Sequence, residues 1–596
     1  MNQPVAKTSF LNTVRGAYRL ARPYGRRKLA FVLAVILAQG VSQLAGVASV
    51  LPFLAIASDP EAAMASRVGE FIVGFTGISE PRSLIIVAGL ISVTALVLAN
   101  IVNLVSVYVQ GRYNASLAHW LRLQLLRHYA DLPYSFFINK NSSLLIRAVT
   151  SYVTQFSLTI VGPLLTAIAS VCTAAMLILA VLIVKPLLTI VGTSIMVAAF
   201  CIMFLLLNPR MKANTNKLKR VNNTALIAVN NFFQGVKPIA VHSASDELIE
   251  SYSKHSLQQA HLQSQLPIFG SLPRSLVEPL AFGGVILYVV YMTANDKSVA
   301  DILPTLGFVA FVGYRTLPAI QNVYAAVTRV VTASYVMEEL KADLDTPVNQ
   351  HHDSLSEPIS WEKQITFEHV DFRHASADEA TLRGIDLTIR KGEKLGVVGT
   401  TGSGKSTLVD MLLGLHLPTS GKMKIDDTTY GPSHAKAWRQ KIGYVPQDIF
   451  LLHDSVIANI ALGVPSEEID VERVREVCRI AQVLNFIESE LDEKFETIVG
   501  ERGIRLSGGT KTRIGLARAL YHRPEMIVLD EATSALDVAT EAAFMKAVFE
   551  ISDDLTYVVI AHRLSTIETC DRTVTLENGT VQQIAHLPDK HTKGRQ

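Results

Sequence analysis

Six long apolar stretches in the first 340 residues restrict the fold more than any other feature of this sequence. They are residues 29–57, 84–109, 158–184, 187–207, 276–292 and 302–326. Each is close to the roughly 20 residues that a helix needs to cross the hydrocarbon core of a bilayer. Because backbone groups in hydrocarbon must bond to one another, these stretches can only be helices there. The sequence therefore predicts an all-α transmembrane domain with six spans over residues 1–340.

The charges between these stretches predict their orientation. The 28 residues before the first span contain Lys and Arg but no Asp or Glu, and the long connections at residues 111–155 and 209–267 are basic near the membrane. Loops rich in Lys and Arg stay in the cytoplasm. We therefore expect a multi-pass protein of the plasma membrane, here a bacterial inner membrane, with a cytoplasmic amino terminus. Binding of particular lipids is the alternative interpretation of these basic residues.

Composition supports a membrane protein and gives no sign of a nucleic-acid partner. The chain has 596 residues, of which 49% are hydrophobic and 18% charged, whereas an ordinary soluble domain has ~25% charged residues. The net charge of +3 comes without a long basic block, so we expect no binding to nucleic acid. Residues 341–360 are polar and contain two prolines, which predicts a linker between two domains.

A glycine-rich loop follows the linker and an apolar strand-like run at residues 395–398. It reads GTTGSGKST and fits the phosphate-loop pattern G-x-x-x-x-G-K-[ST]. A strand that turns into a helix start leaves several backbone N–H groups aimed at one point, which suits a phosphate, although a glycine-rich turn can also arise by chance. The residues expected to surround the phosphates are Gly399, Thr400, Thr401, Gly402, Ser403, Gly404, Lys405, Ser406 and Thr407.

Two acidic residues follow a second apolar strand at residues 525–529. They are Asp530 and Glu531. A carboxylate at the end of a strand beside a phosphate loop can hold Mg²⁺ through water, and a second one can polarise an attacking water. We expect Asp530 in the first role and Glu531 in the second. A glycine turn at residues 507–510 precedes a helical pattern and is either an ordinary cap or a second phosphate-facing helix start.

Five motifs occur in one order along residues 361–585: GTTGSGKST, YVPQD, LSGGT, IVLDEATSALD and IAHRLS. In this order and spacing the segment resembles the ATP-binding cassette (ABC) family. Six spans ahead of one cassette resemble the exporter-type half-transporters of that family. The resemblance implies an α/β P-loop nucleotide-binding domain, with a tail at residues 586–596, that hydrolyses ATP with Mg²⁺ and couples this to transport.

The resemblance also implies roles for individual side chains. Glu531, His562 and Gln447 are the expected catalytic residues, in which Glu531 activates water and His562 contacts the γ-phosphate. Ser406, Gln447 and Asp530 are the expected contacts of Mg²⁺.

Partner contacts follow from the same resemblance. Ser507, Gly508 and Gly509 would close over the ATP held by an opposite cassette, so we expect a homodimer with two competent sites. His374 stands where the family usually has a Tyr that stacks on adenine, which puts the adenine contact in question because an imidazole offers less area. Thr510 stands where Gln is usual.

Charges inside the predicted spans are costly and therefore informative. At 1.5 Å per residue, Glu278 and Arg315 reach similar depths, and Arg274 lies nearer the cytoplasm. An interhelical ion pair is one interpretation. The other is that Arg315 and Arg274 line a cavity and meet an anionic group such as a lipid phosphate.

Two segments resemble the coupling helices of exporters, at residues 134–150 and 230–252. Residues 49–58 and 314–328 look similar to a subgroup that contains lipid-linked oligosaccharide flippases and some peptide exporters. The expected function is thus ATP-driven export or flipping of an amphipathic substrate, first a lipid-linked oligosaccharide or similar anionic lipid. A peptide or hydrophobic drug exporter is the alternative, and an ATP-regulated channel or regulator comes after these.

Overall fold

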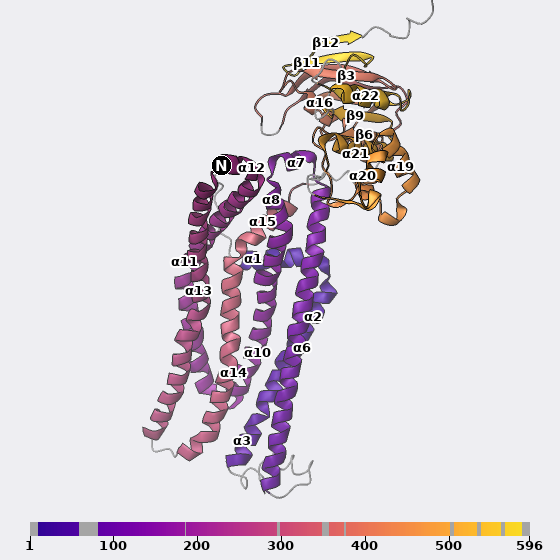
Figure 1. The fold of residues 1–596 in the computed structure, drawn as a ribbon. Helices are drawn as coiled ribbons and strands as arrows, with labels where there is room; N and C mark the ends of the chain where they lie inside the picture. Colours follow the sequence, from indigo (N-terminus) through magenta and orange to yellow (C-terminus); the bar gives the residue numbers. More distant parts are fainter. Residues whose placement is uncertain are drawn as a thin grey trace, which may run out of the picture. The chain divides into compact units, whose positions relative to one another are not determined.

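The computed structural model contains two compact units (Figure 1). One unit comprises Met1–Ala130 and Lys140–Pro347, and the other comprises Asp131–Asn139 and Val348–Gln596. The structure describes residues 10–58, 81–184, 186–294, 299–347, 357–374, 377–500, 506–532, 538–561 and 567–586.

The first unit, called here the membrane unit, is helical throughout its described part. Its main helices are α1 (Phe10–Ala21), α2 (Arg26–Ala48), α3 (Val50–Ser58), α6 (Pro81–Ala130), α8 (Ser142–Arg147), α9 (Val153–Gln155), α10 (Gly162–Val184), α11 (Pro186–Gln234), α12 (Val236–Val241), α13 (Ser245–Ala294), α14 (Val299–Thr332) and α15 (Ser334–Leu344). By length and composition, four helical stretches within the described residues could cross a membrane, namely Arg26–Leu54, Arg82–Ala130, Ser142–Ile183 and Thr189–Gln234. The fifth and sixth predicted spans fall within α13 and α14.

The first predicted span is not one helix but two, because α2 ends at Ala48 and α3 begins at Val50. Pro52 lies four residues after Ala48, and proline has no N–H to donate to the carbonyl one turn earlier. The Ser49 hydroxyl donates to the Gly46 carbonyl over 2.8 Å, and the Ser49 carbonyl accepts from the Ser92 hydroxyl of α6. These side-chain bonds lie beside the break between α2 and α3.

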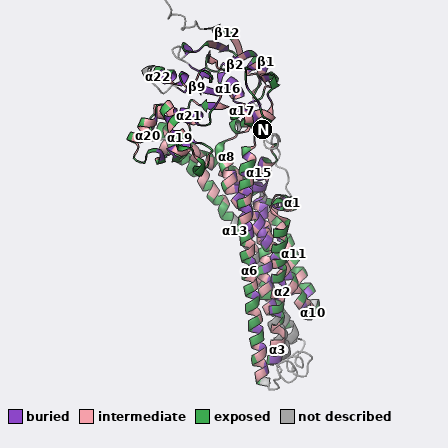
Figure 2. Ribbon diagram, turned by 90° about the vertical axis from the view of Figure 1, so that its right-hand side faces the viewer, coloured by how far each residue is buried: buried purple, intermediate pink, exposed green. Residues whose placement is uncertain are grey.

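Small residues let the helices of the membrane unit approach closely. A Cβ atom added to Gly46 of α2 would lie 3.1 Å from the Cβ atom of Ala99 of α6. Such contacts between small residues are typical of membrane helix packing. Many residues along α6 are exposed (Figure 2), and they include large apolar ones such as Leu104, which is 68% exposed.

The second unit, called here the cassette unit, contains three sheets. A four-stranded antiparallel sheet has the order β2 (Leu382–Arg390), β1 (Gln364–Phe372), β4 (Ser420–Ile425), β5 (Thr428–Thr429). A six-stranded, mostly parallel sheet has the order β12 (Thr580–His586), β11 (Arg572–Glu577), β3 (Lys394–Gly399), β10 (Thr556–Ile560), β9 (Met526–Asp530), β6 (Ile442–Val445). A small sheet pairs β7 (Asp454–Ser455) with β8 (Ile498–Val499).

Besides short 3-10 turns, the cassette unit also contains eight helices within its described residues. They are α7 (Tyr134–Asn139), α16 (Lys405–Leu412), α17 (Ala435–Arg439), α18 (Val456–Ile460), α19 (Val471–Ile480), α20 (Leu484–Glu490), α21 (Gly508–Tyr521) and α22 (Val538–Phe549). The segment with α7 is part of the region in which the sequence predicts the first coupling helix, and it groups with the cassette although it lies between membrane helices in the chain.

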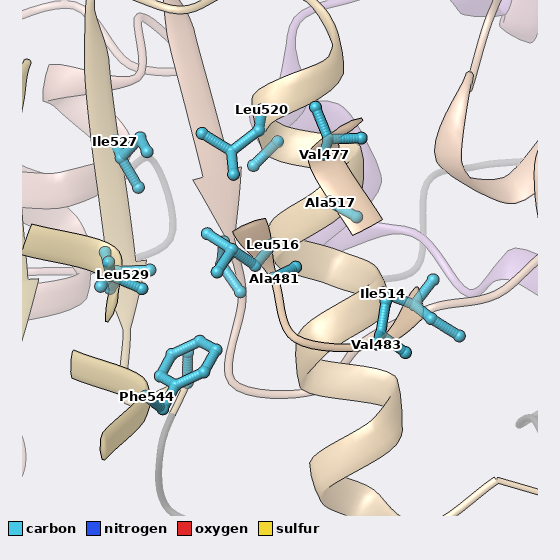
Figure 3. Close-up of a cluster of buried hydrophobic side chains, with 14 of the residues drawn as sticks. Val477, Ala481, Val483, Ile514, Leu516, Ala517, Leu520, Ile527, Leu529 and Phe544 are labelled. Carbon is cyan, nitrogen blue, oxygen red and sulfur yellow. The ribbon is translucent and has the colours of Figure 1, made fainter. Parts of the chain in front are cut away.

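Two hydrophobic cores hold the cassette unit together, one on each face of the parallel sheet. Ile527 and Leu529 of β9 point into the core built with α19, α21 and α22 (Figure 3). Met526 and Val528 of the same strand point into the other core, which also contains Trp438. A central parallel strand is buried on both faces, which is why residues 526–529 read as a continuous apolar run.

Candidate functional site

The glycine-rich loop connects β3 to α16 and has the geometry that only glycine allows. Gly399, Gly402 and Gly404 have φ angles of 156°, 82° and 100°. A Cβ atom at Gly399 would lie 2.2 Å from the Leu576 carbonyl oxygen, and one at Gly404 would lie 2.7 Å from Cδ2 of Leu382. There is therefore no room for a side chain at Gly399 or Gly404. The loop brings the N-terminus of α16 to the end of β3.

The ammonium group of Lys405 is held inside this loop. Its Nζ donates to the carbonyl oxygens of Gly399 over 2.8 Å and of Thr400 over 3.0 Å. Lys405 is buried, Ser406 is exposed beside it, and Thr407 is buried. The Ser403 hydroxyl is buried and has no hydrogen-bond partner among the described residues. A positive charge, an unpaired hydroxyl and a helix N-terminus thus converge on one cradle, as a bound phosphate requires.

The order of the parallel strands brings the other predicted residues to the same edge. In the sheet register Ile560 of β10 lies between Val397 of β3 and Asp530 of β9. Because parallel strands end at one edge, the loops after them meet there. The Gln447 Nε2 atom donates to Glu531 Oε2 over 2.8 Å. The structure thus brings together Gln447 and Glu531, which are 84 residues apart in the chain.

Backbone geometry directs Glu531 at this edge. Its φ angle is 47°, which is uncommon for a residue with a side chain and costs conformational energy. Its backbone N–H donates to the Ile560 carbonyl over 3.1 Å. Strain of this kind concentrates at functional sites, where the surrounding structure holds it in place.

An excess of carboxylates gives the site its electrostatic character. Burial and the neighbouring Glu531 raise the pKa of Asp530, while Tyr444 and Lys405 act in the opposite direction. Burial, followed by the charge of Asp530, raises the pKa of Asp410 to about 6. Like charges in a desolvated place favour protonation unless a cation joins them. This donor set therefore suits a divalent cation.

Magnesium fits these residues better than a metal that needs a protein cage. The described residues contain no group of three or more His, Cys, Asp and Glu arranged to hold an ion. Mg²⁺ is usually bound by one or two protein groups together with substrate phosphates and water. Ser406, Gln447 and Asp530 remain the predicted contacts, and ATP would supply the phosphates.

Ser507 is the N-cap of α21, so the glycine turn is the first turn of that helix. Its Oγ atom accepts from the Thr510 N–H over 3.2 Å and lies 2.8 Å from the Thr510 hydroxyl. Ser507 therefore caps this helix, and the Thr510 hydroxyl lies beside the cap. Closure of Ser507, Gly508 and Gly509 over the ATP of a partner stays a prediction.

His374 lies in a small aromatic cluster. Its ring centroid is 4.9 Å from that of Phe372 and 5.6 Å from that of His416, both in edge-on arrangements. The cluster fixes the imidazole at the end of β1, where a base could stack on it, and adenine contact stays a prediction. His562 lies outside the described residues.

Sequence reasoning missed two residues at the strand edge. The Tyr444 hydroxyl donates to Asp530 Oδ2 over 3.3 Å, and Asp410 of α16 shares the desolvated space with Asp530. Tyr444 stands three residues before Gln447 on a strand that ends at the same edge, so its position could have been found from the YVPQ motif. Asp410 gives no such signal, because nothing in the sequence shows that its helix face turns toward β9.

Arg315 in the membrane unit has a neutral partner. Its Nη1 atom donates to Oε1 of Gln43 on α2, and its guanidinium lies 5.5 Å from the ring centroid of Phe311. Glu278 reaches a similar predicted depth, but the hydrogen bond that the structure gives Arg315 is to the amide. The Arg274 side chain lies outside the described residues. The missed residue here is Gln43, which an amide within an apolar span could have indicated.

Further amides lie near Gln43 between α2 and α6. The Gln43 Nε2 atom donates to the Ala99 carbonyl over 3.1 Å, and Gln39 Nε2 donates to Asn103 Oδ1 over 2.8 Å. Gln39 and Gln43 are both buried. A polar strip with spacing four therefore runs along the inner face of α2.

Comparison with known proteins gives matches in both units. Residues 382–534 match the model described as ABC transporter, and residues 47–258 match the model described as ABC transporter transmembrane region.

Two curated relatives cover most of the chain. The heterocyst differentiation ATP-binding protein HepA of Nostoc sp. is 29% identical over 80% of this chain and 77% of its own length. An ATP-dependent lipid A-core flippase of Shewanella frigidimarina is 26% identical over 93% of this chain and 92% of its own length.

The fold is also similar to a solved structure, described as a bacterial Atm1-family ABC exporter with ATP bound. That likeness has a TM-score of 0.78 at 21% identity, and it covers 94% of this chain and 95% of the other. Helices and cassette follow one another in the order of an exporter, both match the same family, and this chain therefore belongs to the ABC transporters, as an exporter with a transmembrane region followed by an ATP-binding domain.

Proposed function

We propose that this chain is a half-transporter that forms a homodimer in the bacterial inner membrane and uses ATP to flip or export an amphipathic anionic substrate. A lipid-linked oligosaccharide or similar anionic lipid is the substrate class. The main observation behind this substrate class is the charge of Arg315 within a membrane helix. The guanidinium of Arg315 has the neutral amide of Gln43 as its hydrogen-bond partner. The orientation follows the positive flanks, so that the amino terminus and the cassette face the cytoplasm.

At the nucleotide, the glycine loop and Lys405 bind the phosphates and Glu531 acts as general base toward water. Gln447 orients the Glu531 carboxylate through the 2.8 Å hydrogen bond, and His562 contacts the γ-phosphate. Magnesium, when bound by Ser406, Gln447 and Asp530, supplies the positive charge that neutralises the phosphates. His374 stacks on adenine, and the imidazole of His374 is held edge-on to the ring of Phe372.

Two copies complete the site. The N-terminus of α21, with Ser507, Gly508 and Gly509, covers the ATP of the opposite cassette. Nucleotide then holds the cassettes together and hydrolysis releases them. Since the homodimer has the same residues at both sites, both hydrolyse ATP.

The substrate class follows from the charge of Arg315. A charge at membrane depth is costly, so it persists where it has a function. An amide can orient the guanidinium but cannot neutralise it, and a phosphate or carboxylate of the substrate can do both. Arg274 contacts the same anion nearer the cytoplasmic entrance, and Glu278 helps to place these two arginines. Several relatives bear the name lipid A-core flippase, which supports an anionic lipid.

The test uses purified full-length protein in vesicles, with Arg315→Ala, Arg315→Lys and the matched control Arg329→Ala, an exposed arginine of the same helix. The readouts are ATP hydrolysis and transbilayer movement of fluorescent phosphatidylglycerol and phosphatidylcholine. We expect stimulation by phosphatidylglycerol to be lost in Arg315→Ala, partly kept in Arg315→Lys and unchanged in Arg329→Ala. Unchanged stimulation in both Arg315 variants removes Arg315 from the substrate path.

The same vesicles separate the alternatives. For a hydrophobic drug exporter, neutral amphiphiles would stimulate hydrolysis and Arg315→Ala would not matter. For an ATP-regulated channel, Glu531→Gln would still open an ion pathway on binding ATP, whereas a transporter with this change stops. A peptide exporter would respond to peptides and not to phosphatidylglycerol.

A further inference from the structure

The chain passes between its two compact units three times. It leaves the membrane unit after Ala130, returns at Lys140, and leaves again after Pro347. The excursion at residues 131–139 contains α7, and the last passage leads into the cassette. Movement of the cassette can reach the membrane helices through the backbone only at these three points.

The buried carboxylate of Asp343 lies close to the third crossing and accepts hydrogen bonds from residues beside the first two. The Tyr129 hydroxyl donates to Asp343 Oδ2 over 2.6 Å. The Lys140 Nζ atom donates to Asp343 Oδ1. The His128 Nε2 atom, 2.9 Å away, donates to the Asp343 carbonyl oxygen. We call these four residues the Asp343 clamp.

Each member of the Asp343 clamp lies close to a crossing in the chain. Tyr129 is one residue before the last residue of the first membrane segment, Lys140 is the first residue of the second, and Asp343 lies four residues before Pro347. All four side chains belong to the membrane unit. The clamp therefore joins, within the membrane unit, the residues beside the three backbone crossings.

The clamp is the end of a longer polar face on α15. Tyr335, Glu339 and Asp343 are spaced by four residues, so they lie on one face of that helix. The Tyr335 hydroxyl donates to Gln155 Oε1 over 3.0 Å, and Glu339 forms an ion pair with Lys219 of α11 at 2.6 Å. Through this face, α15 contacts α9 and α11 before the chain continues to the cassette.

Stability alone does not explain a carboxylate at this position. Asp343 is only 6% exposed, and burying a charge costs free energy that an ion pair repays only in part. Apolar residues of similar size could hold three segments together equally well. A charged, directional contact instead fixes the relative position of the segments, which matters where movement is transmitted.

We propose that Asp343 is a positioning residue for energy coupling, which makes α7 and the C-terminal end of α15 move as one body with the membrane helices. The proposal rests on the proposed function, because it presupposes ATP-driven movement. When the cassettes close or separate, α7 and the linker are displaced together, and the clamp passes that displacement to α6 and α15. Without the clamp, ATP hydrolysis continues while the membrane helices respond less.

The experiment measures movement and hydrolysis separately and needs no substrate. Spin labels are placed at Arg82→Cys, an exposed position at the start of α6, in the full-length dimer in lipid nanodiscs. Cys172 and Cys201 are changed to Ala in this background, while Cys478 and Cys570 are buried. Distances between the two labels are compared without nucleotide and with ATP plus vanadate, and the ATPase rate is measured on the same samples.

The variants are Asp343→Asn and the matched control Asp345→Asn. Asp345 lies two residues away, and its side chain is 67% exposed. Coupling free energies between sites correspond to ~5–150-fold changes in population, so we expect Asp343→Asn to reduce the population with shifted distance by about tenfold. Its ATPase rate should persist, and Asp345→Asn should behave as the parent.

Tyr129→Phe keeps the ion pair and removes one hydroxyl, which tests the clamp if Asp343→Asn does not fold. Its expected effect is a smaller loss of the shifted population. A full shift in a folded Asp343→Asn, or in Tyr129→Phe when Asp343→Asn does not fold, overturns the proposal. So does loss of ATPase activity in proportion to loss of shift, because that indicates general damage.

The proposed substrate is tested independently of the clamp. A parent that hydrolyses ATP and shifts its label distance, but does not move phosphatidylglycerol, contradicts the proposed substrate and leaves the clamp result valid. A parent that shows neither hydrolysis nor shift contradicts both.

Discussion

The membrane unit and the cassette unit differ in the side chains that they expose and in the polar ones that they bury. In the cassette, large apolar residues such as Phe544 and Trp438 are at most 1% exposed. In the membrane unit, Leu104 and Leu205 are 68% and 70% exposed on outer faces, whereas the amide residue Gln43 is 7% exposed. The difference follows from the solvent around each unit, since lipid tails accept an apolar surface that water rejects.

This contrast indicates where each unit performs its chemistry. In the cassette the functional groups gather at one edge of the parallel sheet, outside both hydrophobic cores. In the membrane unit they lie inside the bundle, where Arg315 contacts Gln43. A change in a polar residue should therefore affect activity at the edge of the cassette, and an apolar change should affect stability in its cores.

The largest expected effect tests the polar edge of the cassette. Glu531→Gln keeps the shape of the side chain but removes the general base, which contributes ~10²–10⁴-fold to rate. We expect ATP hydrolysis to fall by about that factor while ATP binding and folding persist. Steady-state hydrolysis and binding of a fluorescent ATP analogue measure the two properties.

The matched control is Glu525→Gln. Glu525 directly precedes β9, whereas Glu531 directly follows it. Although burial opposes it, hydrogen bonds from Lys391 and Lys441 lower the pKa of Glu525, so this carboxylate serves structure. We expect Glu525→Gln to reduce the stability of the cassette and to leave the rate of ATP hydrolysis per folded molecule unchanged. Equal losses of hydrolysis in both variants would mean that Glu531 is no more catalytic than Glu525.

The next effect compares one kind of truncation in the two units. Phe544→Ala opens a cavity in the core of Figure 3 and should destabilise the cassette by ~3–5 kcal/mol. Leu104→Ala removes an apolar side chain from an outer face of α6, where no cavity forms, and should cost less than ~0.5 kcal/mol. Thermal unfolding of the full-length protein in detergent measures both, and similar costs would refute the contrast between the units.

Much of the fold and the nucleotide site could be predicted from the sequence because both depend on local patterns. Apolar runs predict spans, and the motif residues 399–407 predict a strand, a glycine turn and a helix start. The resemblance assigns Gln447 and Glu531 to one site, and the structure joins them by a hydrogen bond. Their proximity also follows from strand order, since parallel strands end at one edge.

The remaining features depend on contacts between distant segments. Arg315 could be identified as a costly charge, but its bond to Gln43 depends on which helix faces lie against each other. Asp343 lies in the segment that the sequence predicts as a linker, but α15 continues to Leu344, and only packing reveals the bonds of Asp343 to Tyr129 and Lys140. Neither pairing has a sequence period or a motif, so a single sequence does not contain a signal for it.

The smallest expected effect is a pH dependence confined to the cassette. Burial and the charge of Asp530 raise the pKa of Asp410 from an ordinary 3.8 to about 6. The folded state therefore holds the proton more tightly than the unfolded state, and stability is lost as pH rises from about 4 to 6. Burial and His374 lower the pKa of the neighbouring His416, which disfavours a positive charge on that ring beside the carboxylate.

Asp410→Asn removes the free-energy cost of ionising this buried carboxyl group while keeping the shape of the side chain. Without nucleotide or Mg²⁺, we expect Asp410→Asn to stabilise the cassette by on the order of 3 kcal/mol at pH 7.5 and to have little effect near pH 4, since one pKa unit corresponds to ~1.4 kcal/mol. Asp427→Asn, an exposed position, is the control and should change stability equally little at both values. Thermal unfolding is followed by tryptophan fluorescence in a Trp120→Phe background, in which Trp361 and Trp438 of the cassette remain, so that it reports on the cassette alone. A gain that is equal at both pH values would show that Asp410→Asn acts through packing rather than through the buried charge.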